Sequence, residues 1–131
     1  MTTTPPEARV QIVNMVRDFV NREVEPVAAE HDREDTIPYD LIDRMKELGL
    51  FGITVPEEYG GMGLDYTTFA SIFEELSKGF MTLSGAIGTH HILTYVLTHY
   101  GTEEQKQRFL PDLASGRKRG EIRRASCRER V

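Results

Sequence analysis

The chain has 131 residues, which suits one domain with a single modest core, and its 39% apolar and 28% charged residues are typical of a folded globular domain. No apolar run approaches the roughly 20 residues that cross a bilayer, and a single cysteine excludes both an internal disulfide framework and a cysteine-based zinc cluster. The net charge of −5 combines a strongly acidic body, residues 1–116, with a basic tail, residues 117–131, and so acidic a body excludes nucleic acid as its partner.

The first predicted helix runs from about Pro5 to His31. Its valines recur at three- and four-residue steps, which marks one buried stripe of Val13, Val16, Val20, Val24 and Val27. Pro26 falls inside this helix, where it removes a hydrogen bond and clashes with the carbonyl of Arg22, so we expect a kink or a break there. The first eleven residues lack the pattern of a secretory signal or a transit peptide, which indicates a cytoplasmic protein.

Two shorter helices are predicted next. One starts near Pro38 and ends at Gly49, and it turns four apolar side chains inward, those of Leu41, Ile42, Met45 and Leu48. The other starts at Asp65, a favourable N-cap residue, and ends at Gly79.

The segment between these helices is apolar first and glycine-rich afterwards. Residues 50–55, LFGITV, predict either an extended segment or a buried turn. Residues 60–63 contain three glycines, which predicts a turn. A phosphate-binding loop is excluded because neither the Rossmann spacing nor a Gly-Lys-Ser/Thr sequence accompanies them.

The last two predicted helices differ in character. The fourth, roughly Thr82 to Tyr100, is apolar on most faces, as is typical of a central helix. A capping box from Thr102 to Gln105 opens the fifth, which we expect to end before Pro111. Because no internal repeat and no alternating strand pattern occur, the sequence predicts an all-α fold, a small bundle of about five helices.

The polar residues form no recognisable catalytic or metal-binding set. His90 and His91 are neighbours, so on a helix their side chains diverge by about 100° and cannot hold one metal ion together. The sequence contains no His-x-x-x-His or Glu-x-x-His pair. We expect one of these histidines to be packed and hydrogen-bonded and the other to face solvent or line a cavity. The tandem glutamates at 57–58 and 74–75 diverge likewise, which favours solvated side chains over an acid–base couple.

Four stretches, in this order, resemble the N-terminal helical domain of the acyl-CoA dehydrogenase family. They are REVEPVAAEHD (22–32), IPYDLIDRMKELGLFGITVPEEYGGMGLDY (37–66), FEELSKG (73–79) and YGTEEQKQRFLPDLASG (100–116). The second and the fourth are the most specific, and their joint occurrence at this separation carries the resemblance. It covers nearly all of residues 7–116.

The resemblance implies a part of an FAD-dependent enzyme that oxidises acyl-CoA to trans-2-enoyl-CoA, is usually a homotetramer and passes electrons to an electron-transferring flavoprotein. In the family, the flavin contacts and the catalytic base lie mainly in a middle β domain and a C-terminal helical domain. We therefore expect residues 1–116 to contain no catalytic, cofactor-binding or metal-binding residue and to be inactive alone. Apolar surface on the fourth helix and on residues 50–55 is expected to be partly exposed.

The family's N-terminal domain forms one wall of the acyl-chain pocket. The positions that match its pocket residues are Ser84, Gly85, Gly88 and Ile92. Three of the four are small, which implies a roomy pocket base. Glycine inside a helix costs roughly 1 kcal/mol relative to alanine, so each of the two glycines calls for a reason, either close helix packing or space for an acyl chain.

Residues 117–131 depart from the family pattern after LASG. The ending EIRRASCRERV is similar to an in-frame translation of a common sequencing adapter. We expect this tail to be non-native and disordered, because its few aliphatic residues cannot offset the entropy of ordering it. The alternative is a genuine basic tail that binds nucleic acid or anionic lipid.

Two other interpretations of the body remain open from sequence. Acyl-CoA oxidases and some flavin monooxygenases share this domain architecture, which would keep the fold and change the chemistry. A stand-alone helical interaction module without catalysis is the alternative from a different class. None of these interpretations requires a membrane partner.

Overall fold

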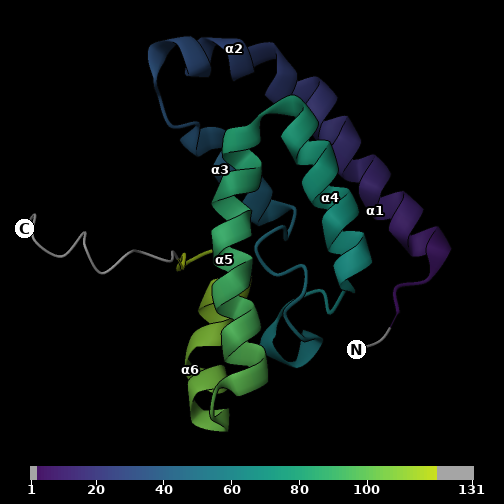
Figure 1. Ribbon diagram of the computed structural model, residues 1–131, viewed down its shortest axis with the longest axis vertical. Helices are drawn as coiled ribbons and strands as arrows, with labels where there is room; N and C mark the ends of the chain where they lie inside the picture. The colour runs from purple at the N-terminus through teal and green to yellow at the C-terminus, as the bar shows by residue number, and fades with distance from the viewer. Residues whose placement is uncertain (1–2, 121–131) are drawn as a thin grey trace, which may run out of the picture.

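The computed structural model describes residues 3–120, and within them every regular element is helical (Figure 1). α1 (Pro6–Phe19) continues through a π-helical turn, η1 (Val20–Val24), into α2 (Glu25–Glu34), so these three form one bent helical unit. The other elements are α3 (Tyr39–Glu47), the 3-10 turn η2 (Glu57–Tyr59), α4 (Tyr66–Gly79), α5 (Met81–Tyr100) and α6 (Glu103–Ala114). The predicted all-α bundle of about five helices is confirmed.

The bend predicted at Pro26 takes the form of the π-helical turn that precedes it. In η1 the Glu25 N–H donates to the carbonyl of Val20, five residues back instead of four. Because Pro26 has no N–H for the carbonyl of Arg22, a wider turn here costs the helix less than it would elsewhere. Figure 1 shows α2 leaving the direction of α1 at this point, and α2 buries none of its residues.

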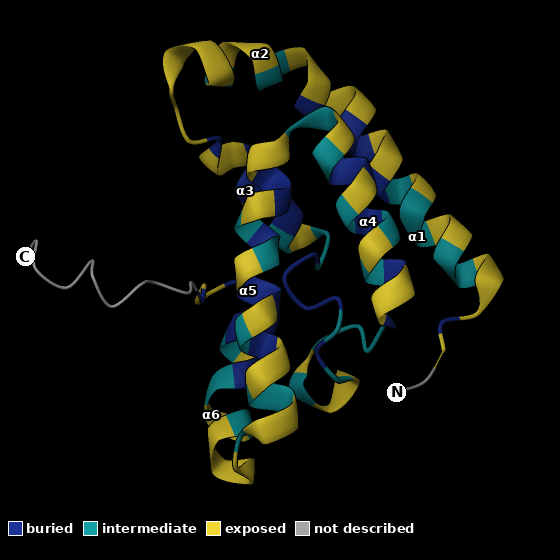
Figure 2. Cartoon of the chain, viewed as in Figure 1, coloured by how far each residue is buried: buried dark blue, intermediate teal, exposed yellow. Residues whose placement is uncertain are grey.

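The core lies around α4, which packs against α1 on one side and α5 on the other, and it includes buried residues of η1, of α3 and of residues 50–53 (Figure 2). The valine stripe of the first helical unit is placed as predicted, with its three middle valines buried and its two outer ones partly buried. α4 approaches η1 closely at Gly79, because a Cβ at this position would collide with Cγ1 of Val20. The close approach of the two helices therefore depends on the missing side chain at Gly79.

Asp65 joins the start of α4 to the N-terminal segment. Its carboxylate caps α4 by accepting from the Thr68 N–H at 2.7 Å, which confirms the predicted N-cap. The same carboxylate accepts from the Thr4 N–H at 2.7 Å, and the Thr4 hydroxyl accepts from the Asp65 N–H at 3.2 Å. Arg9 adds an ion pair at 3.3 Å. The backbone donors of Thr68 and Thr4 hold the pKa of Asp65 well below its usual range.

Glu75 joins the other end of α4 to α1. Arg17 donates to its two carboxylate oxygens at 3.0 and 3.1 Å, and Lys78 pairs with it at 3.0 Å. These bonds, that from Arg17 first, lower the pKa of Glu75 to about 2. The prediction that Glu75 is solvated is wrong, because this carboxylate faces α1 and is buried in a charge-paired contact. Its neighbour Glu74 points outward and is exposed.

Residues 50–55 form a buried turn. Their four large apolar side chains are fully inaccessible, those of Leu50, Phe51, Ile53 and Val55. The glycine-rich loop folds over this turn, and its N–H groups at residues 62–64 donate to carbonyls of residues 52–55 at 2.8 Å. The positive φ angles of Gly60 and Gly63 confirm the turn predicted there. The expectation that residues 50–55 are partly exposed is wrong, since this loop covers them.

α6 begins as predicted and ends later than predicted. Thr102 and Gln105 form the reciprocal capping box, with bonds of 2.9 and 3.3 Å. The helix continues through Pro111 to Ala114, so the expected end before Pro111 is wrong. Proline removes one bond here, to the carbonyl of the exposed residue Gln107, and the added turn buries Leu113 and Ala114.

The first four residues after position 116 lie against the bundle. Arg117 and Lys118 pair with Asp112 at 2.6 and 2.9 Å, and the Gly120 N–H donates to Nδ1 of His90 at 3.2 Å. The predicted disordered tail comprises residues 117–131. Its larger part, residues 121–131, lies outside the described residues, so disorder there stays a prediction.

Candidate functional site

α5 is apolar on two opposite sides. Its inner side is buried in the bundle through Leu83, Ile87, His90 and Thr94. Its outer side is exposed and comprises Met81, Gly85, Thr89, Ile92, Val96 and Tyr100. Four of these six are large hydrophobic residues with exposures of 47% to 78%, and Figure 2 shows exposed residues recurring along the length of α5. A helix face that remains in contact with water is normally polar. Because the outer side of α5 is largely apolar, it is a candidate binding surface.

A hollow of about 440 Å³ opens beside this outer side, between α4 and α5. α4 contributes two aromatic residues one turn apart, and α5 contributes four residues over two turns. The lining residues are Tyr66, Phe69, Gly88, His91, Ile92 and Tyr95. No residue of this lining carries a formal charge at neutral pH, and most of it is aromatic. Such a site suits an apolar or aromatic group better than an ion.

Aromatic rings frame the hollow. The Tyr66 and Tyr95 ring centroids lie 5.8 Å apart, and the Phe69 and His91 rings lie 4.6 Å apart. Burial, with Tyr95 nearby, raises the pKa of the Tyr66 phenol above its ordinary value. Gly88 completes the wall, because a Cβ there would lie 3.2 Å from the ring of Phe73. This close contact supports the packing explanation for Gly88.

The neighbouring histidines are both buried, but they differ in their hydrogen bonds. His90 Nε2 lies 3.1 Å from the carbonyls of both Phe51 and Leu113, and its Nδ1 accepts from the Gly120 N–H. His91 Nδ1 lies 2.8 Å from the carbonyl of Ile87, and its Nε2 has no partner among residues 3–120. Burial lowers the pKa of both rings, that of His91 to about 4. His90 is the packed, hydrogen-bonded histidine of the prediction, and His91 is the one that lines a cavity.

The four residues predicted for the acyl-chain pocket do not gather in one place. Gly88 and Ile92 line the hollow between α4 and α5. Gly85 lines a separate, smaller hollow beside Gly120, and a Cβ on it would meet no atom within 4 Å. Ser84 is buried, and its hydroxyl donates to the carbonyl of Met81 at 2.8 Å. The pocket role of these residues stays a prediction.

Sequence reasoning missed the aromatic half of the hollow. Tyr66 and Phe69 lie on one helix and Tyr95 on the next, so no local pattern joins them. The spacing of Gly88, Ile92 and Tyr95 by four and three residues places these three on one face of α5. That spacing was the one signal available for adding Tyr95 to the prediction.

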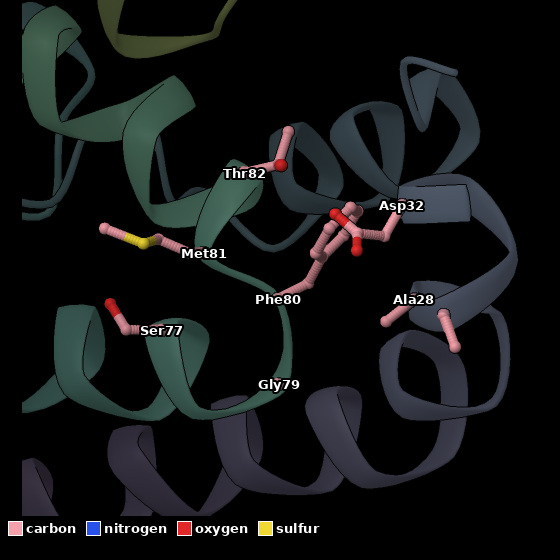
Figure 3. Close-up of a pocket in the computed structure, with 8 residues that line it drawn as sticks. Ala28, Asp32, Ser77, Gly79, Phe80, Met81 and Thr82 are labelled. Carbon is pink, nitrogen blue, oxygen red and sulfur yellow. The ribbon is translucent and has the colours of Figure 1, made fainter. Parts of the chain in front are cut away.

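A second hollow lies between α2 and the turn that joins α4 to α5. Figure 3 shows Ala28 and Asp32 on its α2 side, with Ser77, Met81 and Thr82 contributed by the other wall. The Ser77 hydroxyl already donates to the carbonyl of Phe73 at 2.8 Å. Asp32 is the single charged residue of the lining. This hollow therefore offers no set of converging polar groups, and we assign it no role.

Two further findings concern residues 3–120 only. They contain no group of three or more His, Cys, Asp or Glu side chains placed to hold a metal ion. None of their helices is both long enough and apolar enough to cross a membrane.

Comparison with known proteins identifies the fold's family. Residues 6–117 match the family "Acyl-CoA dehydrogenase, N-terminal domain". The chain belongs to this family. It is 40% identical over 107 residues to the short-chain specific acyl-CoA dehydrogenase of Clostridium acetobutylicum, a match that covers 81% of this chain and 28% of that protein.

Solved structures of the acyl-CoA dehydrogenase family have the same fold. The chain superposes with a TM-score of 0.82 and 27% identity on butyryl-CoA dehydrogenase from Megasphaera elsdenii, covering 92% of this chain and 32% of that one. The same TM-score, at 36% identity and the same coverage, is reached on a chain in a structure of the electron transferring flavoprotein of Acidaminococcus fermentans. The chain spans less than a third of the length of the curated relatives it matches.

Proposed function

We propose that the chain is the N-terminal α domain of an FAD-dependent acyl-CoA dehydrogenase, an enzyme that oxidises acyl-CoA to trans-2-enoyl-CoA. In this proposal the outer side of α5 and the adjoining hollow form one wall of the acyl-chain pocket, with Gly85, Gly88 and Ile92 toward the chain and Ser84 behind them. The observation that carries the proposal is the apolar, uncovered outer side of α5 with an uncharged hollow beside it. An acyl chain needs a surface of this chemistry.

The described residues do not fit FAD by themselves. The N–H groups at residues 60–63, the one glycine-rich stretch among them, all donate to backbone carbonyls of residues 52–57 and are not free to bind phosphate. We therefore place flavin binding and proton abstraction in other parts of the complete enzyme. Residues 3–120 alone are expected to be inactive, because a flavin enzyme must position its cofactor against the substrate.

The partners of the complete enzyme belong to the same proposal. A homotetramer and an electron-transferring flavoprotein as electron acceptor follow from the family resemblance, and a cytoplasmic location is part of the same proposal. The match to a chain in a structure of an electron transferring flavoprotein supports the choice of acceptor.

The test begins with the coding sequence that follows codon 116 in an independent clone. We expect it to encode a β domain and a second helical domain, and the complete protein to carry FAD and to reduce it with acyl-CoA. A stop soon after codon 116, or a complete protein without flavin, would favour the stand-alone interaction module instead. Consumption of oxygen by the reduced enzyme at the rate of turnover would favour an oxidase.

A pair of variants of the complete enzyme tests the pocket wall. Ile92→Trp fills the hollow, so its kcat/KM should fall as the acyl chain lengthens, by about 10- to 200-fold per excluded methylene, with short chains little affected. Val10→Trp is the matched control, since Val10 is comparably exposed on α1, away from both the outer side of α5 and the hollow. Equal losses on all chain lengths in both variants would remove the hollow from the acyl pocket.

A further inference from the structure

His90 joins three segments of the chain through its two ring nitrogens. Nε2 lies 3.1 Å from the carbonyl oxygen of Phe51, in the buried turn, and 3.1 Å from that of Leu113, near the end of α6. Nδ1 lies 3.2 Å from the backbone nitrogen of Gly120. Because a carbonyl can only accept and a backbone N–H can only donate, Nε2 carries the hydrogen and Nδ1 holds a lone pair. These contacts therefore hold the ring neutral and in a single tautomer.

Residues 117–120 follow α6 and lie against α5. Their first half is held by the ion pairs with Asp112 described above. Gly120, at their end, is buried and so close to α5 that a Cβ on it would overlap the side chain of Leu93. A buried backbone N–H needs an acceptor, and Nδ1 of His90 supplies it. The end of this segment therefore depends on a lone pair at Nδ1.

A single proton on the ring breaks one of these three bonds and keeps the other two. Protonation places a hydrogen on Nδ1, which then faces the N–H of Gly120, so that two donors oppose each other. Nε2 keeps its hydrogen and still donates to the two carbonyls, more strongly because the ring is charged. The buried turn and the end of α6 then stay joined to α5, whereas Gly120 loses its acceptor.

The surroundings of His90 favour the neutral ring. Burial lowers the pKa of His90, the carbonyls of Phe51 and Leu113 oppose this shift, and the charge of Arg119 adds to it. The ring of His91 lies 5.7 Å away on the same helix, and burial lowers its pKa to about 4. The segment is therefore held at neutral pH and is released only on the acid side of the ordinary histidine range.

The other ionisable groups around this junction do not change charge as His90 titrates. Residues 50–55 carry none. Lys118 and Arg117 lower the pKa of Asp112 below its ordinary 3.8, so its ion pairs persist above that pH. α3 contributes Lys46, which is paired within its own helix at 2.6 Å. Between about pH 7 and about pH 4.5, the groups here that can take up a proton are the two histidines.

We propose that His90 is a proton-operated anchor for the chain that follows α6: the neutral ring holds residues 117–120 against α5, and a proton from solvent at Nδ1 releases them. The release opens one side of α5, because Arg119 and Gly120 form a wall of the smaller hollow that Gly85 also lines. The anchor is a property of the chain itself and does not depend on the function proposed above.

The test is a pH titration of the 131-residue chain, followed by nuclear magnetic resonance. At neutral pH, imidazole ¹⁵N spectra should show the hydrogen of His90 on Nε2, and the ¹⁵N–¹H heteronuclear NOE of the Gly120 amide should be as high as in α5. As the pH falls, this NOE should drop while the NOEs of α5 stay high. The midpoint of the drop should coincide with the titration of the His90 ring and not with that of His91.

Four outcomes of this titration would overturn the proposal. They are a hydrogen on Nδ1 of His90 at neutral pH, a Gly120 amide that is already mobile there, an amide that stays rigid after His90 is protonated, and a drop that follows His91 instead. Unfolding of the whole bundle before His90 takes up a proton would count equally against it, because the segment would then not be released by itself.

Two variants complete the experiment. His90→Phe keeps a ring of similar size without an acceptor, so the Gly120 amide should exchange about 3- to 10-fold faster at neutral pH, the effect of one hydrogen bond, and its NOE should no longer depend on pH. His99→Gln is the matched control, because His99 is exposed on the same helix and bonds back to the carbonyl of Tyr95. It should titrate like the parent chain.

A Gly120 amide that stays rigid and protected in folded His90→Phe would contradict the anchor, as would an equal loss of protection in His99→Gln. If His90→Phe does not fold, the midpoints measured in the parent chain decide the matter, since they require no variant.

Discussion

Two regions of the molecule differ in how their side chains are partnered: the contact between α1 and α4, and the outer side of α5. In the contact, every buried charge has a partner: Glu75 meets Arg17, and Asp65 meets Arg9 and two backbone N–H groups. On the outer side of α5, large apolar side chains and Gly85 lie uncovered by any of residues 3–120. Folded proteins pair the charges they bury and seldom expose a continuous apolar strip. The difference separates packing that is complete within this chain from a surface suited to a further partner.

The largest expected effect comes from adding one methyl group where α4 packs on η1, the continuation of α1. A Cβ at Gly79 would overlap Cγ1 of Val20 and press on Val24. Gly79→Ala should therefore lower the free energy of unfolding by about 1–3 kcal/mol, the usual cost of overpacking. Urea unfolding followed by circular dichroism measures this. A variant as stable as the parent chain would show that η1 can move away from α4 freely, and the contact would not be tightly packed.

Glu75→Gln tests the charge pairing of the same contact. The amide keeps the shape of the side chain but loses the charge that Arg17 and Lys78 meet, so we expect a loss of about 1–2 kcal/mol at neutral pH. The pKa of Glu75 in the folded chain is about 2, below its ordinary value of 4.5. The stabilisation is therefore present above about pH 4.5 and is lost as the pH falls toward 2.

The pH dependence must be read as a difference between the two proteins. His90 and His91 also have lowered pKa values, so the parent chain and the variant both lose stability as the pH falls below about 6.5. Urea unfolding of both from pH 7 to pH 3 should give curves that run parallel down to about pH 4.5 and converge below it. A constant gap down to pH 3 would mean that the ion pair does not lower the pKa of Glu75.

The same contrast explains what the sequence could and could not predict. Most helix starts and ends were predictable, because Asp65, Thr102 and Gly49 act through bonds or dihedral angles within a few residues of themselves. The end of α6 was the exception, since the helix continues through Pro111. The valine stripe was predictable because apolar residues recur every three or four positions along a helix that buries a single face. The fate of Glu75 was not, since its partner Arg17 lies 58 positions away in sequence. Likewise, α5 is apolar on both sides, and periodicity alone cannot tell which of the two is buried.

The candidate site was predictable only in part, for a related reason. The family resemblance located Gly88 and Ile92, which line the hollow, but it also proposed Ser84 and Gly85, which do not. The aromatic residues of α4 enter the site through helix packing, which no local pattern reports. That Nε2 of His91 finds no partner among residues 3–120 depends on the position of every neighbouring donor, and a sequence carries no local sign of that.

A glycine-to-alanine substitution on the outer side of α5 is expected to change the free energy of unfolding less than Gly79→Ala does, and in the opposite direction. Gly85 is inside a helix, and a Cβ there would meet no atom within 4 Å. Gly85→Ala should raise the free energy of unfolding by about 0.5–1 kcal/mol through helix propensity alone. Because Gly79→Ala and Gly85→Ala make one chemical change, opposite signs in urea unfolding would sharpen the comparison between the two regions. A loss of stability in Gly85→Ala would mean that something within this chain packs against the outer side.

The smallest effect on stability is expected where the effect on association is greatest. Ile92 is half exposed on the outer side of α5, so Ile92→Ser should change the free energy of unfolding by no more than about 0.5 kcal/mol. The 131-residue chain should self-associate through the uncovered strip, and removing the aliphatic side chain at its middle should weaken that association. Sedimentation velocity at matched concentrations measures it, with Val10→Ser as the control, since Val10 is equally apolar and exposed on α1. If Val10→Ser and Ile92→Ser reduce association alike, the attraction comes from scattered apolar residues, and the outer side of α5 loses its standing as a distinct surface.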